Sequence, residues 1–233
     1  MLDVQRAMRS AASPEKAEHS KRFFKTGPGQ YGEGDRFLGL TVPQTRSFMA
    51  ACSSLNLEEV TALLRSEWHE ERLLALLLLC RRFKKDRLRI YELYLGSVSS
   101  CVNNWDLVDS SAPTIVGGYL LPERDRSILD RLAGSTCLWE RRVAVLATLA
   151  FIRADQFEEV LRLCQSLLND RNDLMHKACG WMLREAGKRK PEVLLGFLER
   201  WAGRMPRTML RYAIERLSPE RRLDFMGRQR WTE

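Results

Sequence analysis

Hydrophobic and polar residues follow one another along most of this chain with the three-to-four-residue spacing of an amphipathic α-helix. Ser13, Thr41 and Asn56 each stand just before such a run, where their side chains can cap a helix. Pro14 and Pro191 stand at first helical positions, which proline favours. No stretch shows a convincing period-two alternation of a strand. The pattern therefore predicts an all-α protein, with helices over residues 13–25, 41–55, 56–66, 68–85, 86–100, 103–120, 123–134, 137–153, 155–170, 172–190, 191–203 and 206–218.

Successive helices also form pairs whose length is that of a helical repeat. The pairs are residues 56–66 with 68–85, 123–134 with 137–153, and 155–170 with 172–190. Each pair takes roughly 30–45 residues, and its second helix is the more apolar one, as expected of a helix packed between neighbours. This spacing favours an α-solenoid of helical repeats over a non-repeating helical bundle, which remains the competing architecture.

The segment Thr26–Gly39, "TGPGQYGEGDRFLG", interrupts the helices with five glycines and a proline. It is expected to be a loop, either a mobile connector or a loop that closes over a ligand. It lacks the Lys-Ser/Thr ending of a phosphate-binding loop, which argues against nucleotide binding. We expect one domain over residues 1–233, with an N-terminal helical segment and this loop in 1–40 and the repeats in 41–233.

Charge is distributed unevenly along the chain. The net charge is +8, with 38 Lys and Arg against 30 Asp and Glu, and the isoelectric point is about 9.4. Residues 171–233 hold 15 basic and 8 acidic residues, a net +7, which leaves the first 170 residues nearly neutral. A basic surface on one side of the molecule suggests a polyanionic partner.

Cysteine and histidine argue against disulfides and against a metal site. The three histidines, His19, His69 and His176, are far apart in the sequence, so we expect no zinc site and no cofactor. The cysteines form no CxxC pair and are expected to be free thiols in a reducing compartment; they are Cys52, Cys80, Cys101, Cys137, Cys164 and Cys179.

Nothing in the hydropathy predicts a membrane segment. The longest apolar run, "LLALLLLC" at residues 73–80, is far shorter than the roughly 20 residues that span a bilayer. No signal peptide precedes the chain, so we expect a cytoplasmic protein.

An acidic and aromatic cluster stands out in this basic chain, in "NNWDLVDSSAPTIVGGYL". Trp105 and Asp109 are four residues apart and therefore share a helix face, while Asp106 lies near its edge. The helix dipole explains a carboxylate at the helix start, as at Asp106, but not one beyond the first turn, as at Asp109. Pro113 is expected to bend or end this helix. The alternatives are a solvated helix end and a site for something cationic.

Two basic clusters follow. Arg141 and Arg142 precede an apolar stripe, so one of them must lie near the packed side, either with its head reaching solvent or held beside a phosphate. In the second cluster three cations and an indole share one helix face, which suits nucleic acid better than a protein core, although a solvated amphipathic helix is the plainer interpretation. Its members are Lys177, Trp181, Arg184 and Lys188, and Arg204, Arg207 and Arg211 extend the stripe.

Six segments in this order resemble one known family across nearly the whole chain. They are "SPEKAEHSKRFFKT", "FLGLTVPQTR", "NNWDLVDSSAPTIVG", "LWERRVAVLAT", "HKACGWMLREAGKRKPE" and "PRTMLRYAIERL". The resemblance is to the AlkD-type DNA alkylation-repair glycosylases, and its "WDxVD" and "HKAxGWxLRE" motifs are the most specific. It implies an α-solenoid of HEAT-like repeats with a concave DNA-binding face.

The resemblance also implies an activity and site residues. The activity is monofunctional removal of N3- and N7-alkylated purines from double-stranded DNA, without turning the base out of the helix. The catalytic aspartate falls on Asp109, the active-site tryptophans on Trp105 and Trp181, and DNA-contacting arginines on Arg142 and Arg184. We add Lys177, Lys188 and Arg211 as candidate DNA contacts from the basic clusters. The chain departs from the family pattern with Asn104 in place of Trp, Phe23 in place of Tyr, and a longer first loop, which bears on substrate range.

Elementary chemistry agrees with these roles. An N3- or N7-alkylated purine is already cationic and leaves without a general acid, so the enzyme must stabilise an oxocarbenium-like sugar. A carboxylate at Asp109 supplies the anion, and the faces of Trp105 and Trp181 attract positive charge. We expect these three side chains to meet in an open cleft.

Three other functions compete with this one. A non-catalytic DNA-binding scaffold would not need Asp109, and a protein-interaction scaffold would show no salt-sensitive DNA affinity. A lyase would need a desolvated lysine nucleophile, for which Lys177 is the candidate. We expect a monomer whose partner is duplex DNA, associated with the nucleoid through that DNA, with no membrane and no small-molecule cofactor.

Overall fold

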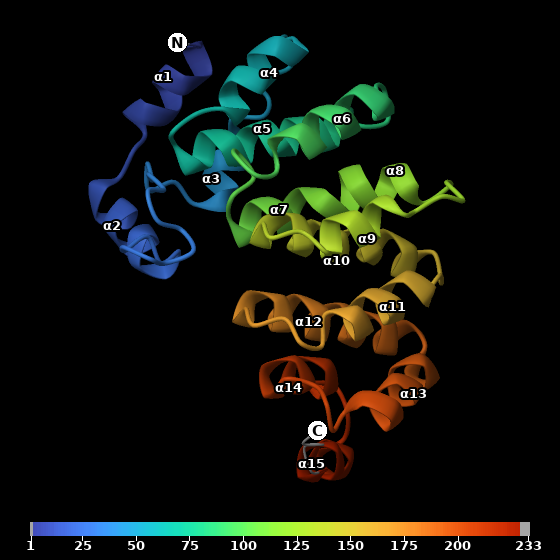
Figure 1. The fold of residues 1–233 in the computed structure, drawn as a ribbon. Helices are drawn as coiled ribbons and strands as arrows, with labels where there is room; N and C mark the ends of the chain where they lie inside the picture. Colours follow the sequence, from blue (N-terminus) through green and yellow to red (C-terminus); the bar gives the residue numbers. More distant parts are fainter. Residues whose placement is uncertain (1, 229–233) are drawn as a thin grey trace. The chain divides into compact units, whose positions relative to one another are not determined.

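The computed structural model describes residues 2–228, which fold almost entirely into helices (Figure 1). The helices are α1 (Asp3–Ser10), α2 (Pro14–Phe23), α3 (Val42–Ser47), α4 (Leu57–Leu64), α5 (His69–Arg82), α6 (Arg87–Ser97), α7 (Trp105–Ala112), η1 (Pro113–Gly117), α8 (Gly118–Leu120), α9 (Ile128–Ala133), α10 (Leu138–Arg153), α11 (Glu158–Ser166), α12 (Asp173–Arg189), α13 (Pro191–Trp201), α14 (Arg207–Ile214) and α15 (Pro219–Gly227). Over residues 2–228 no strand is present, and one isolated bridge joins Arg36 to Trp68. The prediction of an all-α fold is therefore confirmed.

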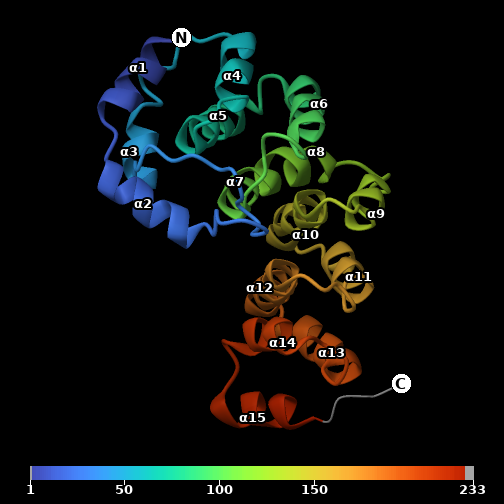
Figure 2. The same ribbon diagram turned by 60° about the vertical axis from the view of Figure 1, so that its left-hand side comes forward.

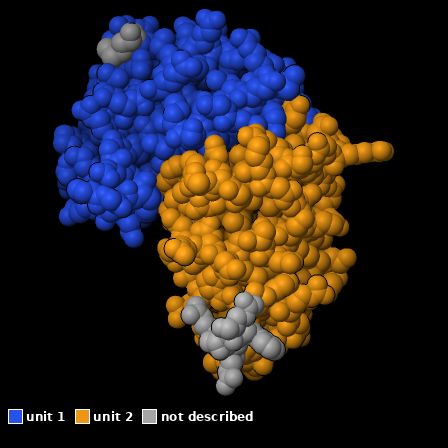
Figure 3. Space-filling view, in the orientation of Figure 1, with its two compact units in different colours: residues 1–111 blue, residues 112–233 orange. Residues whose placement is uncertain are grey.

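The chain divides into two compact units, residues 1–111 and residues 112–233 (Figure 3). This division does not follow the boundary near residue 40 that the sequence suggests, because the N-terminal segment is part of the first unit. Whether the chain behaves as one domain stays a prediction.

In the first unit, α5 is the central element. Helices α3 and α4 both pack against it, and residues 69–79 are all buried, the ionisable first turn at 69–72 as well as the apolar run at 73–79. A stretch that is hydrophobic on every side must lie inside the fold. The "LLALLLLC" run is thus core, and over residues 2–228 no helix combines the length and apolar character needed to cross a membrane.

The second unit has the repeat pattern that the sequence predicts. Helix α12 packs against α10 on one side and α14 on the other, while α9, α11 and α13 flank this row (Figures 1 and 2). The predicted pairs α9–α10 and α11–α12 are in contact, as is α4–α5 in the first unit. Gly180 is needed for this packing, because a Cβ there would lie 2.4 Å from the carbonyl oxygen of Met209 on α14.

Pro113 interrupts α7 without ending the helical path. The chain continues from Ala112 into the π-helical turn η1 and then into α8. Proline lacks the N–H that an α-helical turn would use, and single π turns in helices are frequent at functional sites. The sequence predicts that the helix bends or ends at Pro113; in the structure its type changes locally and the helical path continues.

Two helices, α1 and α15, lie outside the ranges predicted from the sequence. Ser218 caps helix α15, because its hydroxyl accepts a hydrogen bond from the Arg221 N–H, and Pro219 is the first residue of the helix. The same signature marks α2 at Ser13 and Pro14, so the local signal for α15 was present in the sequence.

Candidate functional site

The start of α7 is fixed by Asn104, which is fully buried. Its side-chain oxygen accepts a hydrogen bond from the Trp105 N–H at 2.9 Å, and its amide donates to Asp35 Oδ2 at 3.2 Å. Trp105 and Asp109 follow on this helix, one turn apart and both half-buried. The structure thus places the predicted pair on one face of a helix whose first residue is held in place.

Close to Asp109, inside the first unit, the side chains of Ser111 and Tyr94 form a hydrogen bond. Ser111 donates a hydrogen bond to the Tyr94 hydroxyl at 2.9 Å, and both residues are buried. Burial raises the pKa of Tyr94, and the negative charge of Asp109 contributes to that increase. Tyr94 is therefore a neutral phenol at any ordinary pH.

Asp35, His69 and Asp106 form a chain of hydrogen bonds that crosses the first unit. His69 Nδ1 lies 2.8 Å from Asp35 Oδ2, and His69 Nε2 lies 2.8 Å from Asp106 Oδ2. Arg72 Nη2 donates to the other Asp35 oxygen at 2.5 Å. His69 and Asp35 are buried, and Asp106 is largely so.

Opposite shifts in pKa keep His69 and Asp35 charged. Burial lowers the pKa of His69, but the charge of Asp106 and the hydrogen bonds to Asp106 and Asp35 outweigh it and raise the pKa to about 9. Burial raises the pKa of Asp35, but His69 and Arg72 outweigh that and lower it to about 2. At neutral pH an imidazolium therefore donates to two carboxylates.

The residues next to His69 on α5 anchor the N-terminal segment. Glu70 accepts hydrogen bonds from the backbone N–H groups of Leu38, Gly39 and Leu40 at 2.9–3.1 Å. Gly39 has a φ of +78°, and a Cβ there would lie 2.2 Å from the carbonyl oxygen of Ser13, so only glycine fits. The end of the glycine-rich loop is therefore bound to α5 through Glu70.

An aromatic layer covers the histidine. Phe24 stacks on Phe37 with ring centroids 5.0 Å apart and on Trp105 at 5.4 Å, and it lies 4.9 Å from the His69 ring. Phe23, which is mostly exposed, meets the Trp105 ring edge-on at 5.8 Å. Trp105 is therefore held through Phe24 above the buried imidazolium.

Sequence reasoning missed this arrangement. His69 is an isolated histidine in the sequence, and Asp35 lies within a loop whose glycines dominate its pattern. The available signal was the run of ionisable residues "HEER" at the start of an apolar helix, because charged groups that enter a core must find partners.

In the second unit, the predicted basic face of α12 lies at the surface but is not a row of bare cations. Trp181 Nε1 donates to Glu185 Oε1 at 3.0 Å, and Lys188 Nζ lies 2.7 Å from the same oxygen. Arg184 pairs with Glu215, and Lys177 Nζ lies 2.8 Å from Asp173 Oδ2. The core side of α12 is formed by other residues, such as Met182.

Arg141 and Arg142 are both held by protein groups. Arg142 is buried and donates to the Leu174 carbonyl oxygen at 2.7 Å. Arg141 donates to Asp170 Oδ2 at 2.8 Å and to the carbonyl oxygens of Ser135 and Thr136. Neither arginine is simply solvated, and contact of Arg142 with a phosphate stays a prediction.

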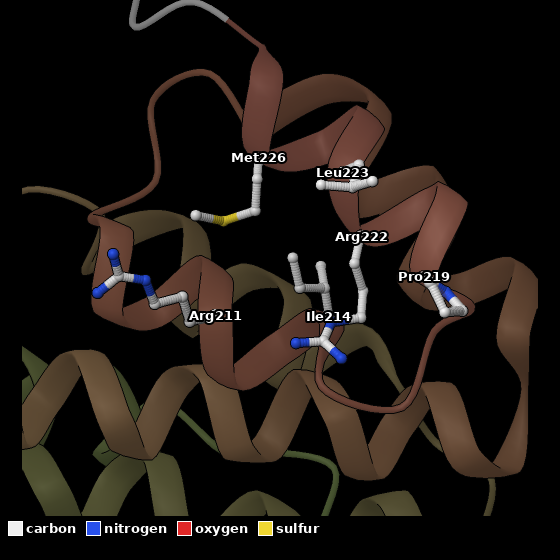
Figure 4. Close-up of a pocket in the computed structure, with 6 residues that line it drawn as sticks. All are labelled: Arg211, Ile214, Pro219, Arg222, Leu223 and Met226. Atoms are coloured by element: carbon white, nitrogen blue, oxygen red, sulfur yellow. The ribbon is translucent and has the colours of Figure 1, made fainter.

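Arg211 lies on α14 at a pocket formed with α15. Arg211 and Arg222 flank a mainly apolar hollow (Figure 4), whose other lining residues are Ile214, Pro219, Leu223 and Met226.

Over residues 2–228, no group of three or more His, Cys, Asp or Glu side chains is arranged to hold a metal ion, and the six cysteines are free thiols.

Comparison with known proteins identifies relatives of this fold. The sequence model of one family, described as DNA alkylation repair enzyme, matches residues 4–217. No curated protein sequence matches the chain.

Solved structures agree with that match. A predicted DNA alkylation repair enzyme from Enterococcus faecalis has a TM-score of 0.74 and 17% identity, over 89% of this chain and 97% of that chain. AlkD2 from Streptococcus mutans has a TM-score of 0.57 and 16% identity, over 88% of this chain and 98% of that one. At these identities the likeness shows the fold alone, an all-α helical-repeat fold.

Proposed function

We propose that this chain, which belongs to the DNA alkylation repair enzyme family, hydrolyses the N-glycosidic bond of N3- and N7-alkylated purines in duplex DNA. The observation that supports this most is the placement of Asp109 one turn after Trp105 on a helix whose start is fixed by Asn104. A fixed carboxylate beside an indole suits a cationic transition state.

The chemistry requires little beyond that placement. Alkylation at N3 or N7 makes the purine a cationic leaving group, so its departure needs no general acid. The sugar left behind is oxocarbenium-like, and Asp109 stabilises its charge and orients the attacking water. A water then adds to the anomeric carbon and loses its proton, which leaves an abasic site.

The basic residues of the second unit are proposed to bind the phosphate backbone, with Trp181 beside the lesion. Lys188 and Glu185 form an exposed ion pair, and such pairs contribute about 0–1 kcal/mol, so a phosphate can replace the carboxylate at small cost. We assign the same role to Arg142, Arg184, Lys177 and Arg211. The protein would act as a monomer in the cytoplasm, on the DNA of the nucleoid.

The direct test is base release from duplex DNA that contains a single 7-methylguanine, measured under single-turnover conditions. Release by the native protein and its loss in Asp109→Asn would support the proposal. DNA binding without release would favour a non-catalytic scaffold, and absence of both would favour a protein-interaction scaffold.

A further inference from the structure

We propose that Asp35 and His69 are positioning residues for base excision, because the chain Asp35–His69–Asp106 and the Phe24 ring fix the turn that carries Trp105. This inference rests on the proposed function for its catalytic consequence. Its structural part, that these groups set the position of the Trp105 indole, stands on the contacts within the first unit.

The hydrogen bonds that link Asp35 and His69 to the surroundings of Trp105 end on the side chains of residues 104 and 106, which flank it. His69 donates to Asp106, the residue that follows Trp105, and Asp35 accepts from both His69 and Asn104, the residue that precedes it. The side chains of the two residues that flank Trp105 are thus linked to the same buried carboxylate, Asn104 directly and Asp106 through the imidazolium.

Asp106 depends on His69 for its partner. Its Oδ2 accepts from His69, whereas its Oδ1 is buried and has no hydrogen-bond partner within residues 2–228. Removing the imidazolium would leave a largely buried carboxylate without its hydrogen bond, which costs free energy and favours movement of the helix start toward water.

Ring contacts also link His69 to the Trp105 indole, through Phe24. The His69 ring lies 4.7 Å from Phe37 and 4.9 Å from Phe24, and Phe24 stacks on Trp105. A displacement of the imidazole is therefore expected to shift the Phe24 ring on which the indole stacks, because closely packed interiors transmit strain.

The glycine-rich loop acquires a role from this arrangement. Asp35 belongs to this loop, and Glu70 accepts hydrogen bonds from the backbone at the end of the loop, from Leu38 to Leu40. Arg72 balances the charge of Asp35. The loop thus serves to insert one carboxylate behind the imidazolium, and misplacement of a reacting group by about 1 Å can cost about 100-fold in rate.

The test uses the full chain and the variants His69→Asn, Asp35→Asn and Phe24→Leu. Glu33→Gln is the matched control, since Glu33 is an exposed carboxylate of the same loop that bonds to the Gly29 N–H and not to His69. Circular dichroism establishes folding, and if His69→Asn does not fold, the other two variants decide the outcome.

The first readout is independent of activity. The chain is labelled with 5-fluorotryptophan at its six tryptophans, and the Trp105 signal is assigned with Trp105→Phe. We expect the fluorine resonance of Trp105 to shift or broaden in all three variants and to stay unchanged in Glu33→Gln. An unchanged Trp105 resonance in the folded variants would overturn the proposal, even if the protein released no base.

The second readout separates binding from chemistry. With duplex DNA bearing 7-methylguanine, the single-turnover rate constant should fall by about 10- to 100-fold, while Kd changes by less than about threefold. If the native protein releases no base, the proposed function fails and the fluorine signal still decides the positioning role. If the native protein and the folded variants release base at equal rates, the positioning role is wrong.

Discussion

His69 and Asp106, 37 residues apart in the sequence, face each other across a hydrogen bond of 2.8 Å. The contact joins the start of α5 to the start of α7, which carries Trp105 and Asp109. Because His69 is buried and cationic at neutral pH, the stability of the first unit depends on this charge, and so does the geometry of the candidate site.

The first prediction concerns pH and stability. His69 has a pKa of about 9 in the folded protein against 6.5 for the free side chain, so its charge stabilises the fold fully below pH 6.5 and ceases to do so as pH rises through 9. His69→Asn should lower the free energy of unfolding by about 3–5 kcal/mol at pH 6, as for a broken buried ion pair. Urea unfolding from pH 6 to 9.5 measures the difference, which should shrink with rising pH.

His19→Asn is the control for this series, because His19 is exposed on α2. A difference between the native protein and His69→Asn that is constant over this pH range would show that the charge of His69 contributes nothing.

The second prediction concerns catalysis. Asp109→Asn should bind DNA as the native protein does but lose about 2–4 kcal/mol of transition-state stabilisation, which slows the reaction roughly 30- to 900-fold, because an amide cannot offset the charge of the sugar. Single-turnover release of 7-methylguanine is the measurement. Asp86→Asn, which changes an exposed carboxylate at the start of α6, should release base normally. Near-native release by Asp109→Asn would remove Asp109 from the site.

The third prediction concerns the face of α12 that is proposed to bind DNA, which carries Lys177, Trp181, Arg184 and Lys188. The affinity for duplex DNA should fall steeply with salt, because bound cations displace counterions from the phosphates. Arg184→Ala should weaken binding regardless of sequence and reduce the slope of log K against log salt by about one unit. Fluorescence anisotropy at several salt concentrations gives both values.

Arg162→Ala provides the matched control, since Arg162 on α11 is also held by two carboxylates, Asp130 and Glu159. An affinity that does not change with salt, or an equal loss of slope in both variants, would argue against a DNA-binding role for the α12 face.

The fourth prediction concerns the two tryptophans. The family resemblance implies that both indoles act in excision, so Trp105→Ala and Trp181→Ala should each slow it. If the two act on the same transition state, the double variant should lose less than the sum of the two free energies. Single-turnover rates of the four proteins complete the cycle. Strict additivity would indicate that the two indoles act separately.

The fifth prediction distinguishes hydrolysis from lyase chemistry. A lyase forms an imine with the sugar, which borohydride reduces to a stable protein–DNA bond. Lys177, the lysine considered for that role, is partly exposed and lies in an ion pair with Asp173, so it is not the desolvated amine that this chemistry requires. We expect no covalent adduct on gels after borohydride treatment and an intact abasic strand. An adduct that disappears in Lys177→Ala would show that the mechanism is wrong.

Local sequence was sufficient to predict most of the helices, although not α1 and α15, and several of the helix ends. The spacing of apolar residues is a local property, and Ser13, Thr41 and Asn56 cap the helices that they were predicted to begin. The same spacing placed Trp105 and Asp109 on one face of α7 and identified the helix pairs of the second unit.

The partners of the charged residues could be decided only by the tertiary structure. Asp35 and His69 are 34 residues apart, and Arg184 and Glu215 are 31 apart, so no periodicity connects them. The sequence places "HEER" at the start of an apolar run, but that these residues are buried, and which groups neutralise them, depends on how the glycine-rich loop returns to α5. A buried charge is stable only where the fold brings an opposite charge or a donor to it, and that is a property of packing rather than of local sequence.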